Sequence, residues 1–233
     1  MSVEQQAVNI TEPRTGESVF VYEVPVRLWH WLNALCIVTL AITGYLIASP
    51  LPSVSGEASA NFLMGYIRFA HFAAAYIFTI GFLVRLYWAI VGNEHAKQLF
   101  VLPITRSQWW SGLWHELRWY LFLDKQARRY TGHNPLGHLF MFLFITVTGT
   151  LMIITGFALY SEGKGLGSWQ DLLFGWVIPF FGGSQAVHSW HHLGMWGIVC
   201  FVIIHIYTAI REDILSRQTM ISAMISGMRT FKD

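Results

Sequence analysis

Residues 188–211 read HSWHHLGMWGIVCFVIIHIYTAIR and decide the fold class of the chain. From Leu193 to Ile210 this segment has no Asp, Glu, Lys or Arg, and it is long enough to cross a bilayer as a helix. His191 and His205 are fourteen residues apart, so a helix returns them to within about 40° of one face, roughly 21 Å apart along its axis. One face of this helix therefore carries an imidazole near each surface of the membrane.

The composition of the whole chain is that of a membrane protein. Of its 233 residues, 54% are hydrophobic and only 12% are charged, and the mean hydropathy is +0.45. A formal net charge of +2 is too small to predict a nucleic-acid partner. Cys36 and Cys200 lie in separate apolar runs with no CxxC or CxxCH motif, which excludes covalent haem attachment and a cysteine-ligated zinc or iron–sulfur centre.

Hydropathy predicts four membrane spans and no cleavable signal peptide. The polar residues 1–24 lack the basic start and the early apolar core of a signal peptide, so the first span must serve as the insertion signal. The spans are expected at residues 28–48, 65–91, 136–160 and 187–210. The expected fold is therefore an all-α membrane protein, a four-transmembrane-helix bundle.

The basic residues indicate which side of the membrane each loop occupies. The segments before span one, between spans two and three, and after span four contain Arg14, Arg27, Lys97, Arg106, Arg118, Lys125, Arg128, Arg129, Arg211, Arg217, Arg229 and Lys232. The other two loops offer only Arg68 and Lys164. By the positive-inside rule both termini are cytoplasmic. The chain then divides into a cytoplasmic segment 1–27, a membrane domain 28–210 and a cytoplasmic tail 211–233.

Two loops carry features of their own. Residues 107–120, SQWWSGLWHELRWY, place Trp109, Trp110, Leu113 and Leu117 on one helical stripe, which predicts a short cytoplasmic helix lying in the membrane interface. The glycine-rich loop 161–186 on the other side is either a docking surface for a partner or a flexible connection.

Four of the ten histidines lie within the predicted spans, namely His30, His71, His191 and His205. With the predicted topology, His71 and His191 lie near the outer face, and His30 and His205 lie near the cytoplasmic face. An imidazole in hydrocarbon needs partners for both ring nitrogens, so each of these residues is a functional candidate. Two depth-matched imidazole pairs inside a four-helix bundle are what two b-type haems require.

The same residues also fit roles that involve no haem. The histidines could bond across helices without a cofactor, whereas zinc is disfavoured because no further Cys, Asp or Glu lies at similar depth. His192 faces nearly the opposite side of its helix from His205, which favours its neighbour His191 as a ligand. Arg27 and Arg68 are candidates either for neutralising haem propionates or for ordinary interfacial anchoring.

Small residues inside the spans have two interpretations as well. They could let a flat porphyrin approach the backbone, or they could simply permit close helix–helix contact, the commoner reason for glycine in membrane helices. The glycines concerned are Gly44, Gly81, Gly149, Gly156, Gly194 and Gly197.

Three segments together resemble the b-type cytochrome subunit of membrane-bound nickel–iron hydrogenases. They are Arg27-Leu28-Trp29-His30-Trp31-Leu32, His71 in the second span, and His188-Ser189-Trp190-His191-His192-Leu193 followed by His205. The resemblance covers essentially the whole chain. It implies a subunit of the bacterial inner membrane, surrounded by lipid, that anchors a periplasmic hydrogenase. The partners implied are the large nickel–iron subunit and the small iron–sulfur subunit, which joins the anchor through its C-terminal membrane helix.

The resemblance also implies a route for electrons. They would pass from iron–sulfur clusters to an outer haem b held by His71 and His191, then to an inner haem b held by His30 and His205. The final acceptor would be a quinone, menaquinone or ubiquinone, near the cytoplasmic side. By similarity to formate dehydrogenase subunits, His133 and Asn134 would lie at the quinone, unless these residues only cap the third span.

With this resemblance the chain is expected to be the electron-transfer subunit of a hydrogen:quinone oxidoreductase complex. It holds no nickel-binding cysteines, so the hydrogen-activating site belongs to a partner. Quinone reduction needs protons, for which His133, His138 and Glu116 are the candidate relays. Three rival interpretations are the dihaem subunit of a formate dehydrogenase, a self-contained cytochrome of the b561 type acting on quinol, and a transporter or anchoring protein without haem.

Overall fold

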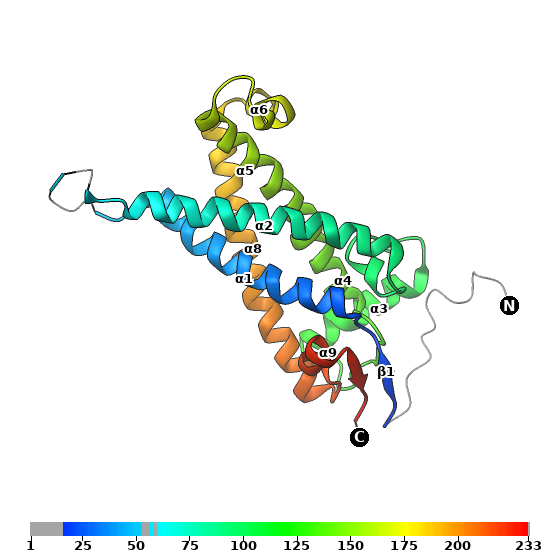
Figure 1. Cartoon of the computed structure of the whole chain (residues 1–233). Helices are drawn as coiled ribbons and strands as arrows, with labels where there is room; N and C mark the ends of the chain where they lie inside the picture. Colours follow the sequence, from blue (N-terminus) through cyan, green and yellow to red (C-terminus); the bar gives the residue numbers. More distant parts are fainter. Residues whose placement is uncertain (1–15, 53–55, 58–59, 233) are drawn as a thin grey trace. The chain divides into compact units, whose positions relative to one another are not determined.

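The computed structural model describes residues 16–52, 56–57 and 60–232 (Figure 1). Residues 1–15, which include Arg14 and most of the predicted N-terminal segment, lie outside the described residues. The chain divides into two compact units. The first unit comprises Met1–His30, Arg85–Thr146 and Phe201–Asp233, and the second unit comprises Trp31–Val84 and Val147–Cys200.

Four helices are long and apolar enough to cross a membrane, as the hydropathy predicted. They are α1 (Val24–Ala48), α2 (Leu63–Val91), the continuous segment Pro135–Lys164, and α8 (Ser184–Leu215). All four begin a few residues before the predicted spans, and the last two also end later. The helices are longer than the predicted spans because helical hydrogen bonding continues through polar residues, such as those at the end of α8. A prediction from hydropathy leaves such residues outside the span.

The third of these segments is not a uniform α-helix. It consists of α4 (Pro135–Met141), a π-helical turn η4 (Phe142–Val147) and α5 (Thr148–Lys164). Asn134 caps its start, because the Asn134 side chain accepts a hydrogen bond from the Gly137 N–H and proline occupies the first helical position. The sequence signal Asn134-Pro135 therefore identified this helix start correctly.

The first unit contains a small sheet that joins the two ends of the described chain. Strand β1 (Ser18–Phe20) pairs antiparallel with β2 (Met228–Thr230), with Ser18 opposite Thr230. The short helix α9 (Met220–Ser226) precedes β2 and ends at Gly227, whose φ of 85° is easily adopted only by glycine. The core beside the sheet consists of Val21, Tyr22, Val26, Ala96 and Ala223.

The predicted helix between spans two and three is present as α3 (Ser107–Tyr120), after a short 3-10 turn η3 (Ala96–Leu99). Trp109 and Glu116 are buried, whereas Trp110 of the predicted stripe is exposed. On its buried side α3 packs against the chain through Gly112, where an added Cβ would lie 2.9 Å from the Pro135 ring. The position of this helix in the membrane interface stays a prediction.

In the second unit, the loop 161–186 has a structure of its own. It forms α6 (Trp169–Phe174) and α7 (Val177–Phe180). Val177 is fully buried with Ala158 of α5 and Val187 of α8 in a small hydrophobic core. Burial of these side chains holds the segment against the ends of two membrane helices, so it is more than a flexible connection.

Candidate functional site

His71 of α2 and His191 of α8 both lie in the second unit. Gly44 of α1 shows how they are arranged. A Cβ added at Gly44 would lie 3.3 Å from His71 Cε1 and 3.5 Å from Met195 Sδ. His71 therefore packs against α1 beside the turn of α8 that directly follows His191.

His191 packs against α5 in a similar way. A Cβ added at Gly156 would lie 3.2 Å from His191 Cε1. The neighbouring His192 is engaged elsewhere, because its Nε2 accepts a hydrogen bond of 2.9 Å from Trp196 Nε1 and so uses the lone pair that a metal would need. His188 is exposed, and its Nδ1 lies 3.0 Å from the Ser184 carbonyl oxygen. Of the three, His191 alone packs against Gly156.

His30 of α1 and His205 of α8 come together in the first unit. Their ring centroids are 6.3 Å apart and the ring planes are inclined by 53°. An imidazole nitrogen lies about 2 Å from the metal it binds and about 1 Å from the centre of its own ring, so two imidazoles on opposite sides of one metal have centroids roughly 6 Å apart. The observed separation therefore fits a single iron ion between the two rings.

Each pair supplies two imidazoles and no further ligand. Among the residues that the structure describes, no group of three or more His, Cys, Asp or Glu side chains could hold a metal ion. Haem iron needs only two axial ligands because the porphyrin supplies the other four. The ligand number, the 6.3 Å ring separation and the glycines beside His71 and His191 thus fit haem.

A family model described as prokaryotic cytochrome b561 matches residues 21–227. The chain belongs to this family. It is 62% identical over 220 residues to the probable Ni/Fe-hydrogenase B-type cytochrome subunit of Azotobacter vinelandii, covering 94% of this chain and 92% of the relative. The corresponding protein of Cupriavidus necator is 57% identical over 224 residues, covering 96% and 92%. The probable Ni/Fe-hydrogenase 1 B-type cytochrome subunit of Escherichia coli K12 is 51% identical over 219 residues, covering 92% of each chain.

Membership of the prokaryotic cytochrome b561 family confirms the predicted class, a multi-pass membrane cytochrome, and supports haem b as its cofactor. The names of the relatives confirm the resemblance to hydrogenase cytochrome subunits drawn from the sequence. The number of haems and the residues that hold them stay predictions.

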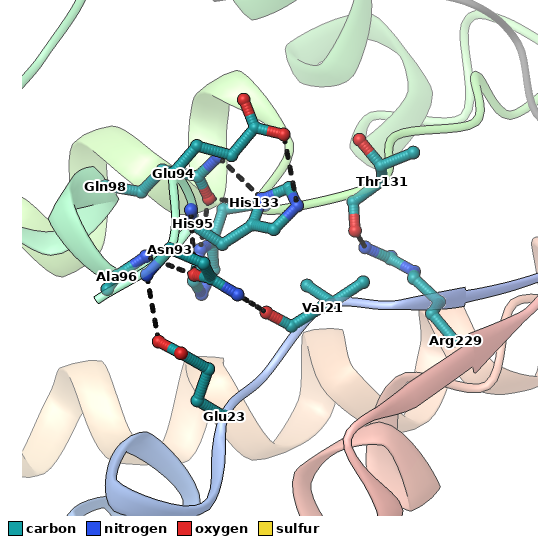
Figure 2. Close-up of polar contacts among 10 residues, drawn as sticks. All are labelled: Val21, Glu23, Asn93, Glu94, His95, Ala96, Gln98, Thr131, His133 and Arg229. Carbon is teal, nitrogen blue, oxygen red and sulfur yellow. Dashed lines mark hydrogen bonds and ion pairs between the residues drawn. The ribbon is translucent and has the colours of Figure 1, made fainter.

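Figure 2 shows the surroundings of His133, a candidate quinone residue, in the first unit of this cytochrome b561 family member. His133 Nδ1 donates to Gln98 Oε1 at 3.1 Å, and Tyr22 OH lies 3.4 Å from His133 Nε2. Burial lowers the pKa of His133 well below its ordinary value, and the positive charge of Arg229 acts in the same direction. His133 is therefore neutral, with a bonding partner at each ring nitrogen.

The Gln98 side chain extends this network toward the surface. Its Nε2 lies 3.3 Å from His95 Nδ1, and His95 Nε2 lies 3.9 Å from the exposed carboxylate of Glu94 (Figure 2). Gly132 makes room for it, since a Cβ there would lie 2.6 Å from Gln98 Oε1. The arrangement gives His133 a line of polar side chains that ends at a solvent-exposed acid.

The other candidate quinone residue, Asn134, is buried and uses both ends of its amide. Its Oδ1 accepts from the Gly137 N–H at 2.7 Å, and its Nδ2 donates to Tyr120 OH at 3.3 Å. The structure therefore gives Asn134 the capping role that the sequence left open. Contact with a quinone stays a prediction for both His133 and Asn134.

The two arginines predicted near the haem propionates lie in different settings. Arg27 of α1 donates a hydrogen bond to the Ile225 carbonyl of α9, so it ties the start of α1 to the C-terminal segment. Arg68 lies on the exposed side of the start of α2. Their assignment to propionates stays a prediction.

The second span also contains a buried arginine that was not among the predicted site residues. Arg85 is only 4% exposed, donates to the Ala96 carbonyl at 2.5 Å, and lies over the rings of Trp29 and Phe100 at 5.6 and 5.5 Å. These contacts offset part of the cost of burying a cation. The signal was present, because an arginine inside the apolar run 81–88 is unusual for a membrane helix.

Two candidate proton relays are buried in the first unit. Glu116 of α3 is 2% exposed, and burial, assisted by the nearby Glu212, raises its pKa to about 8. Glu212 of α8 accepts a hydrogen bond of 2.9 Å from Trp119 Nε1. His138 of α4 is 6% exposed and lies edge-on to the Trp109 ring, with centroids 6.5 Å apart. An acid with a pKa as close to neutrality as that of Glu116 can hold or release a proton under physiological conditions.

Proposed function

We propose that this chain is the dihaem cytochrome b of a membrane-bound nickel–iron hydrogenase, anchoring the hydrogenase and passing electrons from hydrogen oxidation to quinone. The observation that carries the proposal is the pairing of His30 with His205 at a ring separation of 6.3 Å. The hydrogenase assignment is supported by the names of relatives at 51–62% identity along nearly the full chain.

Two haem b groups would be held by His71 with His191 and by His30 with His205. Held by two imidazoles each, these groups would supply one-electron redox chemistry, which suits electron transfer rather than substrate binding. The task of the protein is to fix the four imidazoles and to exclude competing ligands. His192 is not available as a ligand, because its Nε2 already accepts a hydrogen bond from Trp196 Nε1.

The names of the relatives support the proposed partners, and the positive-inside rule supports the proposed orientation in the membrane. Both termini would be cytoplasmic in a bacterial inner membrane, and His71 and His191 would lie near the periplasmic face. That side would receive electrons from the small iron–sulfur subunit, whose C-terminal membrane helix would pack on this chain. The large nickel–iron subunit would activate hydrogen.

Quinone reduction would occur beside His30 and His205. Reducing a quinone, menaquinone or ubiquinone, to quinol consumes two protons as well as two electrons. The first unit holds the candidate quinone residues His133 and Asn134 together with Glu116, a group able to deliver a proton. Glu116 is suited to delivery because it holds its proton at neutral pH.

The test is a haem count combined with two activity assays on the purified complex. The wild-type complex should contain two haem b per chain and reduce both quinone and an artificial dye with hydrogen. His205→Ala should contain one haem and lose quinone reduction while dye reduction persists, because the dye takes electrons before they reach this chain. His192→Ala is the matched control and should behave as wild type. Two haems retained in His205→Ala would overturn the assignment.

The purified complex also separates the rival interpretations. Co-migration of a nickel–iron protein supports the hydrogenase subunit. Co-migration of a formate dehydrogenase instead, or a chain that purifies alone and oxidises quinol, would replace the proposal by one of the alternatives. A chain without the visible α-band of reduced haem b would exclude all three cytochrome functions.

A further inference from the structure

The tripeptide Ile-Thr-Gly occurs twice in the membrane helices of the second unit. It is found as Ile42-Thr43-Gly44 on α1 and as Ile154-Thr155-Gly156 on α5. Each copy lies against one histidine of a different helix, the first against His71 and the second against His191. The same three residues therefore support both members of one histidine pair.

The hydrogen bonds of the two copies match closely. Thr43 Oγ1 lies 2.9 Å from His71 Nδ1, and Thr155 Oγ1 lies 2.8 Å from His191 Nδ1. Each threonine hydroxyl also lies 2.6 Å from the backbone carbonyl oxygen four residues earlier, at Thr39 and Leu151 respectively.

These bonds determine where the imidazole protons lie. A hydroxyl has one hydrogen, and a carbonyl oxygen can only accept, so each threonine donates its hydrogen to the carbonyl. The threonine oxygen must then accept from the histidine, which places a proton on Nδ1 of both His71 and His191. In each neutral ring the lone pair is left on Nε2, the form that binds a metal.

The glycine of each copy sets how close the ring can come. A Cβ at Gly44 would lie 3.3 Å from His71 Cε1, and a Cβ at Gly156 would lie 3.2 Å from His191 Cε1. Both distances are shorter than ordinary van der Waals contact between carbon atoms, about 3.5–4.0 Å. Any larger residue would therefore push the imidazole away from the threonine beside it.

We propose that the two Ile-Thr-Gly segments position the haem ligands His71 and His191 in the same way. In each segment the threonine hydroxyl keeps the imidazole proton on Nδ1, and the glycine leaves room for the imidazole ring to lie beside that hydroxyl. The inference rests on the proposed function, which makes these two histidines ligands of one haem. A hydrogen bond to the Nδ1–H of a ligating histidine makes the ring a more basic ligand and holds its orientation. More basic ligands favour ferric over ferrous iron, so they lower the reduction potential.

The variants that test this remove the hydroxyl and keep the side-chain shape. Thr43→Val and Thr155→Val should each raise the midpoint potential of one haem, shift its low-spin ferric EPR signal, and weaken its retention about ten- to a hundred-fold. Both variants should affect the same haem and leave the other unchanged. Thr43→Ser and Thr155→Ser retain a hydroxyl and should restore the potential and the EPR signal.

Two threonines of the same unit provide matched controls. The Thr39 hydroxyl donates to the Leu35 carbonyl at 2.9 Å and the Thr79 hydroxyl donates to the Ala75 carbonyl at 2.8 Å, each within its own helix. Thr39→Val and Thr79→Val remove the same group without touching a histidine ring nitrogen. Neither should change a haem potential or EPR signal.

The outcomes separate this inference from the proposed function. Unchanged potentials, EPR signals and haem retention in Thr43→Val and Thr155→Val would overturn the positioning role, as would two variants that perturb different haems. If His71→Ala retains two haems, the ligand assignment itself is wrong. A further outcome is that His71→Ala loses a haem while both valine variants match wild type. That result would contradict the positioning role but would still agree with the proposed function.

Discussion

The two histidine pairs of this protein are supported by different chemistry. His71 and His191 are each held by a threonine hydroxyl and a glycine from a neighbouring helix. His205 of the other pair stacks on Phe201, with centroids 5.6 Å apart and planes inclined by 26°, and Phe201 stacks in turn on Phe144 at 5.2 Å. Both members of the first pair are thus held by threonine hydroxyls, whereas His205 of the second pair lies in a stack of aromatic rings.

This difference suggests how one chain can tune two similar sites. Hydrogen bonds at Nδ1 raise ligand basicity and lower the reduction potential, whereas stacking fixes a ring plane with little effect on the nitrogen lone pair. Because both of its ligands carry such a bond, we expect the haem at His71 and His191 to have the lower potential. Electrons would then run downhill toward His30 and His205, the direction that the proposed function requires.

The largest expected effect comes from removing one ligand of the hydrogen-bonded pair. His191→Ala should lose one haem b completely, because one imidazole cannot supply both axial bonds. The haem count by pyridine haemochrome assay should fall from two to one, and the remaining signal should be that of the higher-potential haem. Loss of the higher-potential haem instead would reverse the comparison.

The next largest effect is expected from substituting the two glycines that pack against His71 and His191. Gly44→Ala and Gly156→Ala should each weaken retention of the lower-potential haem by about ten-fold, because the added methyl group pushes the imidazole off its threonine. Haem release to an excess of an apo-globin measures this directly. Gly163→Ala is the matched control on α5, since a Cβ there meets nothing within 4 Å. Equal release from all three variants would show that the glycines serve only helix packing.

A substitution in the aromatic stack should act on the other pair alone. Phe201 is 6% exposed, and Phe201→Leu keeps an apolar side chain while removing the ring that faces His205. The EPR signal of the higher-potential haem should shift because the His205 plane is free to rotate, and the lower-potential haem should keep both its signal and its potential. A change confined to the lower-potential haem would show that Phe201 does not act on the haem held by His205.

The smallest effect is a pH dependence that belongs to the first unit. The pKa of Glu116 is raised from 4.5 to about 8 in the folded protein, so the folded state binds a proton that the unfolded state releases between these values. The contribution of Glu116 to stability should therefore be complete below about pH 4.5, fall as the pH rises toward 8, and level off above it.

Glu116→Gln keeps the shape of this side chain and removes the titration. The melting temperature of the complex in detergent should fall by a few degrees between pH 6 and 8 in the wild type and by less in the variant. A wild type and a variant with the same slope would show that Glu116 does not carry the pH dependence.

The sequence was sufficient to predict the features that depend on a regular pattern along a single helix. Four apolar runs predicted four membrane helices, and the fourteen-residue spacing placed His191 and His205 at two levels of α8. The pairing of His30 with His205 also followed, because topology and depth together leave few partners for an intramembrane histidine. These predictions depend on local periodicity and bilayer thickness alone.

Contacts between different helices could not be predicted in the same way. Whether Thr43 meets His71 depends on how α1 and α2 rotate against each other, and the sequence pattern does not determine that rotation. The burial of Glu116 instead of Trp110 depends likewise on how α3 packs against Pro135. The repeated Ile-Thr-Gly was visible in the sequence, but three common residues are too short a signal to be noticed without the structure.

The β1–β2 ladder imposes an order on the synthesis of this protein. Ser18 and Thr230 share a hydrogen bond of 2.7 Å, yet they are separated by nearly the whole length of the chain. Strand β1 leaves the ribosome before any membrane helix and waits without a partner until β2, at the other end, has been made. The unit that contains His30 is therefore completed only after the last membrane helix, α8, has been made.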